Sequence, residues 1–163
     1  MKSVEQVTRE AVESGGVLAL LYFDVHGNSK EVVQNTMVEF VSRITKERGV
    51  IYAVGEIEEI IELNEMFSTS AEVKVLTKDF ASLVGIAVLY SPIGVEVLEP
   101  HSIRLSIPEA QSIILNAAQT SQEFATFVLD RIMKPDELAE FKKKMAGKAE
   151  LGKRLMERKK DAK

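Results

Sequence analysis

The sequence predicts an α+β protein with a ferredoxin-like core, in which two helices pack on one face of a four-stranded antiparallel sheet. The main observation is the order of patterns over roughly 17–99, which reads strand, helix, strand, strand, helix, strand. The composition, 45% hydrophobic and 28% charged, is that of a globular chain. At 163 residues the chain can bury a core that needs no metal or disulfide.

A short helix precedes this core and leads into its first strand. Ser3 and Gln6 have the spacing of a capping box, and two glycines follow Ser14, so a helix is expected from Ser3 to Ser14. The next residues, 17–25, are almost all apolar. A strand that is apolar on both faces belongs in the middle of a covered sheet.

The first core helix is expected after a turn at 26–29. Either Asn28 or Ser29 is placed to cap it, apolar residues then recur at three- and four-residue steps up to Ile44, and Gly49 suits the left-handed position after its end.

Two further strands and a second helix follow. Residues 50–63 predict a strand that is interrupted at Glu58-Glu59, by a bulge or by its end, with a turn near Asn64-Glu65; propensity alone would also allow a helix over 56–66. Strict alternation predicts a half-buried strand over 70–75. The remaining expectations are a helix over 78–90 capped by Thr77, a strand over 95–99 ended by Pro100, and an edge strand over 103–107.

The rest of the chain is expected to be helical. An apolar stripe begins near Pro108 and is compatible with one helix, or with two if Thr120 caps a second. Pro135 interrupts the pattern, and a last helix carries Leu138, Phe141 and Met145 before it fades towards Gly152. We therefore divide the chain into an α+β domain with packed helices, 1–133, and a basic C-terminal helical extension, 134–163.

The charge differs strongly between these two parts. Residues 134–163 hold eleven Lys/Arg and six Asp/Glu, a net charge of +5, whereas residues 1–133 carry −9. The simpler interpretation is a solvated helix whose charges aid solubility, or one folded against the acidic body. The alternative is contact with nucleic acid, which the six interspersed acids disfavour because net charge drives affinity for phosphates.

Composition also excludes several kinds of chemistry. The chain has no cysteine, so disulfides, thiol catalysis and cysteine-ligated metals are excluded, and its two histidines supply little for acid–base work. We expect no catalytic residues, no metal and no cofactor. No apolar run approaches the ~20 residues of a membrane span, and acids stand where a signal peptide is apolar, so we expect a cytoplasmic protein with no membrane partner.

The candidate ligand site is the turn between the first strand and the first core helix. A helix N-terminus presents free N–H groups and a positive dipole end, which favour a small anionic ligand. The residues expected to bind it are Asp24, His26, Gly27, Asn28, Ser29 and Lys30. The alternative is that Asn28 or Ser29 only caps the helix and Gly27 only makes the turn.

This turn resembles that of the ACT domains, which are amino-acid-binding regulatory domains. The likeness rests on Asp24 and Gly27, an Asp-x-x-Gly at the end of the first strand of a βαββαβ pattern. It implies domains that pair through sheets or helices, with a small ligand at the interface near the turn. The sequence departs from the family by having His26 in place of a proline and by its helical C-terminal extension.

We therefore expect a non-enzymatic, self-associating ligand-binding or regulatory module. Self-association is expected because two helices would leave one sheet face uncovered. One alternative is an RNA- or ribosome-associated protein that uses the basic C-terminal helix, although an RNA-recognition motif is disfavoured because the strand over 70–75 has no aromatic residue. The second is an enzyme with carboxylate chemistry, since five glutamates lie between Glu56 and Glu65; a solvated acidic face is the simpler interpretation of that cluster.

Overall fold

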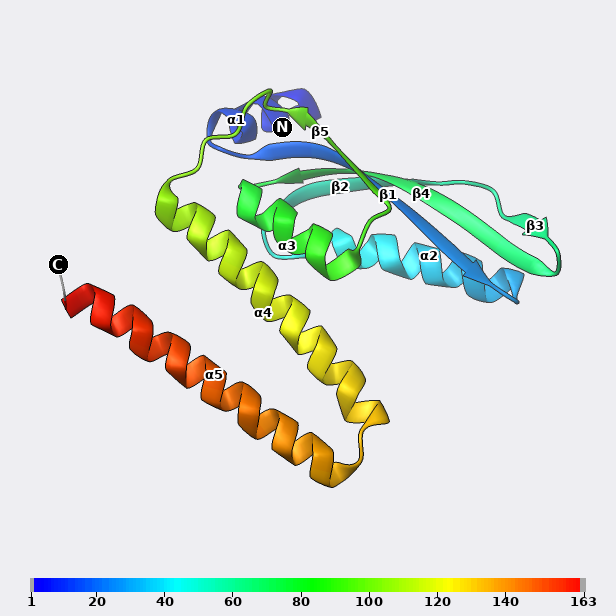
Figure 1. The fold of residues 1–163 in the computed structure, drawn as a ribbon. Coiled ribbons are helices and arrows are strands. Elements are labelled where there is room, and N and C mark those ends of the chain that lie inside the picture. The colour runs from blue at the N-terminus through cyan, green and yellow to red at the C-terminus, as the bar shows by residue number, and fades with distance from the viewer. Residues whose placement is uncertain (1, 162–163) are drawn as a thin grey trace. The chain divides into compact units, whose positions relative to one another are not determined.

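The computed structural model describes residues 2–161, which form five helices and one five-stranded antiparallel sheet (Figure 1). This confirms the α+β class. The strands are β1 (Val17–Gly27), β2 (Val50–Ile57), β3 (Ile61–Leu63), β4 (Met66–Thr77) and β5 (Gly94–Glu99). The helices are α1 (Val4–Glu13), α2 (Lys30–Ile44), α3 (Phe80–Tyr90), α4 (Ile107–Ile132) and α5 (Pro135–Asp161).

The strand predicted over residues 17–25 to lie in the middle of the sheet is β1, and it does lie there. The sheet order is β2-β4-β1-β5, so β1 lies between β4 and β5. Leu21 in β1 is opposite Val73 on one side and Val95 on the other. Because side chains alternate between the two faces of a strand, these three residues lie on the same face of the sheet.

The sheet has five strands rather than the predicted four. The expected interruption at Glu58-Glu59 is confirmed, but the chain pairs again as β3, which lies against β4. A second strand fits there because β4 is twelve residues long, twice the alternating stretch predicted over 70–75. The predicted turn is also confirmed: Asn64 and Glu65 both adopt positive φ, at 52° and 63°.

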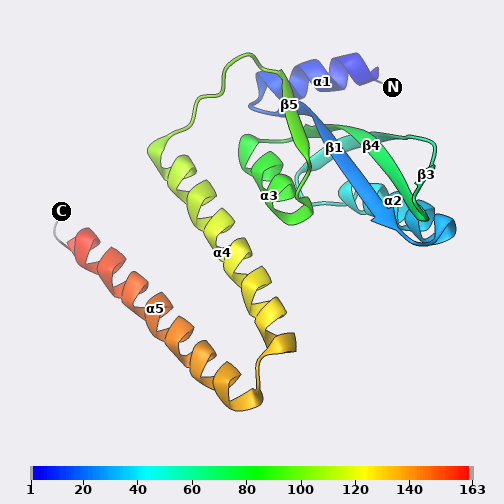
Figure 2. The same cartoon turned by 45° about the vertical axis from the view of Figure 1, so that its right-hand side comes forward.

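The hydrophobic core lies on one face of the sheet. Figures 1 and 2 show α2 and α3 on that side and α1 on the other. The period-2 alternation of β1 and β4 points every second side chain at the two helices. The buried residues that form this core are Val17, Ala19, Leu21, Phe23, Met37, Ile44, Ala71, Val73, Val75, Leu83 and Ile86.

The ends of the helices confirm two predicted caps and correct a third. Ser3 and Gln6 form the capping box of α1, and the Ser29 side chain accepts from the N–H of Val32 at the start of α2. The helix over 78–90 is capped by Asp79, not by Thr77. Thr77 pairs as the last residue of β4, so its backbone belongs to the sheet, and its hydroxyl donates to the carbonyl of Asp79.

The edge strand expected over 103–107 is absent, since the described residues 101–106 have no regular structure. Pro100 has no N–H with which to extend the β5 ladder. The chain instead leads to α4, whose first turn is closed by a capping box: the N–H of Glu109 donates to Ser106 Oγ, and Glu109 Oε2 accepts from the N–H of Ser106. α4 is one unbroken helix through Thr120.

The chain divides into two compact units, Met1–Thr120 and Ser121–Lys163, with the boundary inside α4. In the second unit, Lys142 Nζ lies 3.0 Å from Asp130 Oδ1 and ties α5 to the end of α4. The prediction that the last helix fades at Gly152 is wrong, because α5 continues to Asp161. A single glycine costs a helix only about 1 kcal/mol, and the neighbouring Lys, Glu, Leu and Arg residues are good helix formers.

Candidate functional site

The predicted site lies where β1 passes into α2, but much of it has a structural role. Ser29 caps α2, and its carbonyl accepts from the N–H of Val33. At Gly27 a Cβ atom would stand 2.9 Å from the Val33 side chain, which is buried. Ser29 is therefore the helix cap of the alternative interpretation. The turn expected over 26–29 is shorter than predicted, because His26 and Gly27 still belong to β1 and pair with Ser68 and Phe67.

Asp24 and His26 point to the face of the sheet opposite α2 and α3. They are two residues apart on β1, so their side chains project in the same direction. His26 Nε2 lies 2.6 Å from Asp24 Oδ2, and both side chains are exposed in part.

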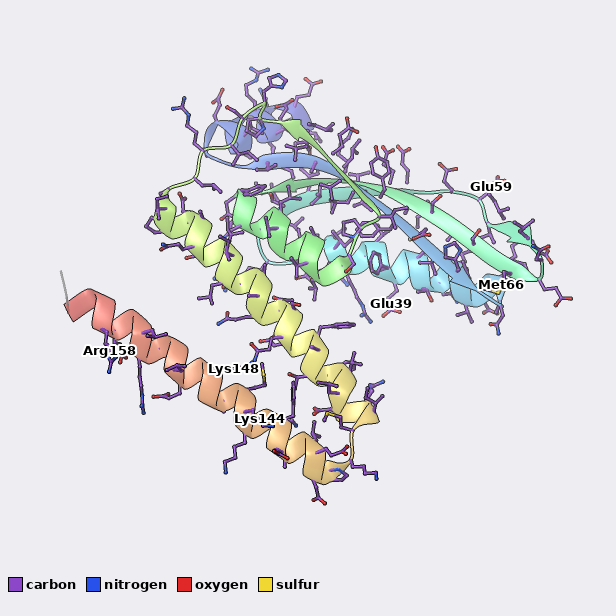
Figure 3. The ribbon with its side chains drawn as sticks, viewed as in Figure 1. Glu39, Glu59, Met66, Lys144, Lys148 and Arg158 are labelled. Atoms are coloured by element: carbon purple, nitrogen blue, oxygen red, sulfur yellow. The ribbon has the colours of Figure 1, made fainter. Side chains whose placement is uncertain are left out.

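These two residues help to line an open cavity of about 640 Å³ near the β3 end of the sheet. Figure 3 marks the region by Glu59 and Met66. The cavity is also lined by Glu58 and Glu59, which precede β3, and by hydroxyl groups of β4. The full lining is Asp24, His26, Glu58, Glu59, Ile61, Ser68, Thr69 and Ser70.

The other four predicted residues, Gly27, Asn28, Ser29 and Lys30, do not line this cavity. Its walls are held by the backbone: Glu58 N donates to the carbonyl of Ser70 at 2.9 Å, and Thr69 Oγ1 donates to the carbonyl of Glu58 at 2.8 Å. Three carboxylates repel an anion and attract an ammonium group or other hydrogen-bond donors. Among the described residues, no group of three or more His, Asp or Glu side chains is arranged to hold a metal ion.

A second hollow, also of about 640 Å³, lies between α2 and α3 and has no counterpart in the sequence-based predictions. Phe40, Leu89 and Tyr90 supply its apolar wall, while Arg43 and Glu47 stand among the charged groups at its rim. Burial raises the pKa of Tyr90 to about 12, and the hydrogen bond to Glu47 acts in the same direction. The rim carries both signs of charge and so selects no ligand class.

The sheet face away from α2 and α3 is not the bare apolar surface that was expected. α1 covers one end of it, where Leu18 and Leu76 are buried and Thr8 hydrogen-bonds Tyr52. Beyond α1 the face carries a row of Glu56, Glu72 and Tyr22 across three strands. Burial, then the charges of Glu72 and Glu96, raise the pKa of Tyr22.

Exposed apolar residues occur on several elements, and β5 and α4 are among them. Val95 and Val97 lie on the side of β5 that faces the core, yet they are 51% and 41% exposed. On α4, Ile114 is 69% exposed and Leu115 is 49% exposed. The thirteen residues 110–122 of this helix include no charged residue. An exposed helix face without charge is unusual in a free surface and typical of one that a partner covers.

No helix of the described residues is long and apolar enough to cross a membrane. Comparison with known proteins adds a family but no activity. No curated protein and no solved structure matches the chain. The model of the MJ0538 family matches residues 18–150.

Proposed function

We propose that this chain, which belongs to the MJ0538 family, is a non-enzymatic, self-associating binding module built on a ferredoxin-like core. The observation that carries the proposal is the exposed apolar surface of β5 and α4, above all the uncharged stretch 110–122. Apolar area of this kind is stabilised when a partner removes it from water.

The ferredoxin-like core is supported by the order of elements once β3 is set aside. Along the chain they run β1, α2, β2, β4, α3, β5, which is the βαββαβ order. In space the strands run β2-β4-β1-β5, so each helix connects strands that are not neighbours. On this proposal α1 and β3 are local additions and α4 with α5 form the extension.

Self-association is proposed over other partners because the two units differ in charge. Residues 1–120 hold nine Lys/Arg and seventeen Asp/Glu, a net charge of −8. Residues 121–163 hold twelve Lys/Arg and eight Asp/Glu, a net charge of +4. Two copies can therefore place opposite charges against each other. The basic residues of α5, among them Lys144, Lys148 and Arg158 (Figure 3), are interspersed with acids, and Lys144 pairs with Glu140. This mixing disfavours the RNA alternative.

Light scattering on the full chain tests the proposal. One chain has a mass of 18.1 kDa. We expect a larger mass at micromolar concentration, falling towards that of one chain on dilution. A matched pair of variants locates the surface. Ile114→Glu, on α4, should lower the mass, whereas Val54→Glu, on the sheet face away from α2 and α3, should not. The mass of a single chain at every concentration would refute the proposal.

The cavity at Asp24 and His26 favours a second candidate function, the binding of a small ligand that carries an ammonium group. Its three carboxylates supply the complementary charge, and Ser68 and Ser70 supply hydrogen bonds. In a panel of polyamines, amino acids and nucleotides, only compounds with an ammonium group should raise the melting temperature. Glu58→Gln should remove the rise and Glu99→Gln, away from the cavity, should not. A rise caused by nucleotides alone would contradict the assignment.

A further inference from the structure

A row of residues with the seven-residue spacing of a coiled coil runs along α4. Its members succeed one another at alternating steps of four and three, which keep a residue on one side of a helix. Every one of them is exposed. The row is Ile107, Gln111, Ile114, Ala118, Ser121, Ala125, Val128 and Ile132, and we call it the α4 row.

No charged residue occurs at any of these eight positions. Single exposed apolar residues are common on protein surfaces and carry no information. A regular row is different: Ile114 and Ile132 are 69% and 73% exposed, and small residues fill most of the positions between them. Small side chains let two helix backbones approach closely, and larger ones at the ends complete the contact.

Among the residues that the structure describes, the contacts within each unit leave the members of this row exposed. In the first unit α3 meets α4 at Ile113, Ala117 and Thr120, which lie on another side of the helix. In the second unit the half-buried residues of α4 are Thr126 and Leu129, and Asp130 pairs with α5. Helical periodicity places Ile113, Ala117, Thr120 and Asp130 away from the α4 row, whereas Leu129, four residues after Ala125, borders it; the row's own members all stay exposed.

We infer that the α4 row is where two copies of the chain meet, the two α4 helices packing antiparallel and crossing at Ser121. This inference rests on the proposed self-association and names its surface. An antiparallel pair puts Ile114 of one copy opposite Val128 of the other, so that large residues close both ends. It also sets the half of α4 that belongs to the acidic first unit of one copy, net charge −8, beside the half that belongs to the basic second unit of the other, net charge +4. A parallel pair would place like charges together.

The length of α4 is sufficient for such a contact. Its 26 residues make a helix about 39 Å long and about 10 Å across. A second helix along that length covers roughly 600 Å² of each copy, the lower end of what stable interfaces bury. The contact has two-fold symmetry, so it closes on itself and yields a dimer rather than a filament.

Single cysteines test this arrangement in the full chain, because the protein has none of its own. At a crossing on Ser121, Ser121→Cys brings two sulfurs within disulfide range under mild oxidation. Ile114→Cys alone should not cross-link, because two such residues would be about 21 Å apart. Mixed with Val128→Cys it should form a heterodimer. Glu123→Cys, on the other side of the helix, is the matched control and should remain reduced.

Each result decides a separate point. Disulfide dimers of Ser121→Cys and of the Ile114→Cys and Val128→Cys mixture support the antiparallel pair. Cross-linking of Ile114→Cys to itself shows parallel helices and overturns it. A dimer by light scattering in which neither Ser121→Cys nor the mixture cross-links overturns the α4 row while leaving self-association intact. A monomer by light scattering refutes both proposals.

Discussion

The hydroxyl of Tyr90, at the end of α3, donates a short hydrogen bond to Oε1 of Glu47, just after α2. The two helices that cover the sheet are thus tied at their C-terminal ends. The Tyr90 ring also meets Phe40 edge-on, with 5.1 Å between ring centres. Tyr90→Phe should keep the ring contact and lose the hydrogen bond, which costs about 1–2 kcal/mol of unfolding free energy. Urea denaturation of the wild type and of Tyr90→Phe at pH 8 measures this difference in unfolding free energy.

The same pair predicts a loss of stability at alkaline pH. Burial and Glu47 raise the pKa of Tyr90 to about 12 in the folded protein, above the ordinary value of 10. A group with a raised folded pKa stabilises the protein fully below its unfolded pKa and loses that contribution as pH rises through the folded value. The difference in stability between the wild type and Tyr90→Phe should therefore shrink between pH 10 and 12. A constant difference would contradict the assignment.

The Asp79 cap predicts a loss of folding stability at acid pH. Burial alone would raise its pKa, but the hydrogen bonds from Ser82 prevail and the pKa is lowered. Its stabilisation is present above the ordinary carboxyl pKa and is lost as pH falls through the lower folded value. Asp79→Ala should cost about 1 kcal/mol at pH 7 because α3 loses its cap. Asp79→Asn keeps a capping oxygen, so it should retain most of the stability at pH 7 and lose the acid dependence.

Gly27 tests the packing between β1 and α2. A Cβ atom there would stand 2.9 Å from the buried Val33 side chain, so Gly27→Ala should destabilise the protein and Gly27→Val should cost about 1–3 kcal/mol. Gly85, within α3, is the control: nothing lies within 4 Å of its Cβ position, and Gly85→Ala should stabilise the helix by up to about 1 kcal/mol. Equal effects of the two alanines on the melting temperature would show that the contact with Val33 is unimportant.

The end of α5 is expected to contribute little to stability. The side chains described over 147–155 are exposed, so deleting residues 147–163 removes solvated charge and few buried contacts. The melting temperature should change by only a few degrees, and the deletion should leave the oligomeric state unchanged. Loss of RNA retention at low salt, with the fold intact, would instead support the RNA-associated alternative. A large fall in melting temperature would show that this end is structural.

The parts of the fold that could be predicted are those that local residues determine. The apolar run of β1, the Ser29 cap and the turn at Asn64 each depend on a few neighbouring side chains. The Asp79 cap could not be chosen over Thr77 from local pattern, since both are good capping residues. Because β4 extends to Thr77, the backbone of Thr77 belongs to the sheet and Asp79 becomes the cap of α3.

The acidic cavity depends on contacts between distant parts of the chain. Asp24 pairs with Ser70 in the sheet, and Glu58 donates its N–H to the carbonyl of Ser70. Nothing in the spacing of residues 24–30 indicates that the carboxylates of Glu58 and Glu59 come to lie nearby. The sequence does show five glutamates in this region, but only the pairing of β1, β4 and β2 brings two of them towards His26.

The mass of the full chain in solution, measured by light scattering from low to high micromolar concentration, tests the central claim most directly. At the upper end we expect twice the 18.1 kDa of one chain. Ile114→Glu should return the mass to that of a single chain, with the fold intact by circular dichroism. A wild-type mass equal to that of one chain throughout this range would contradict the self-associating module and the α4 row together.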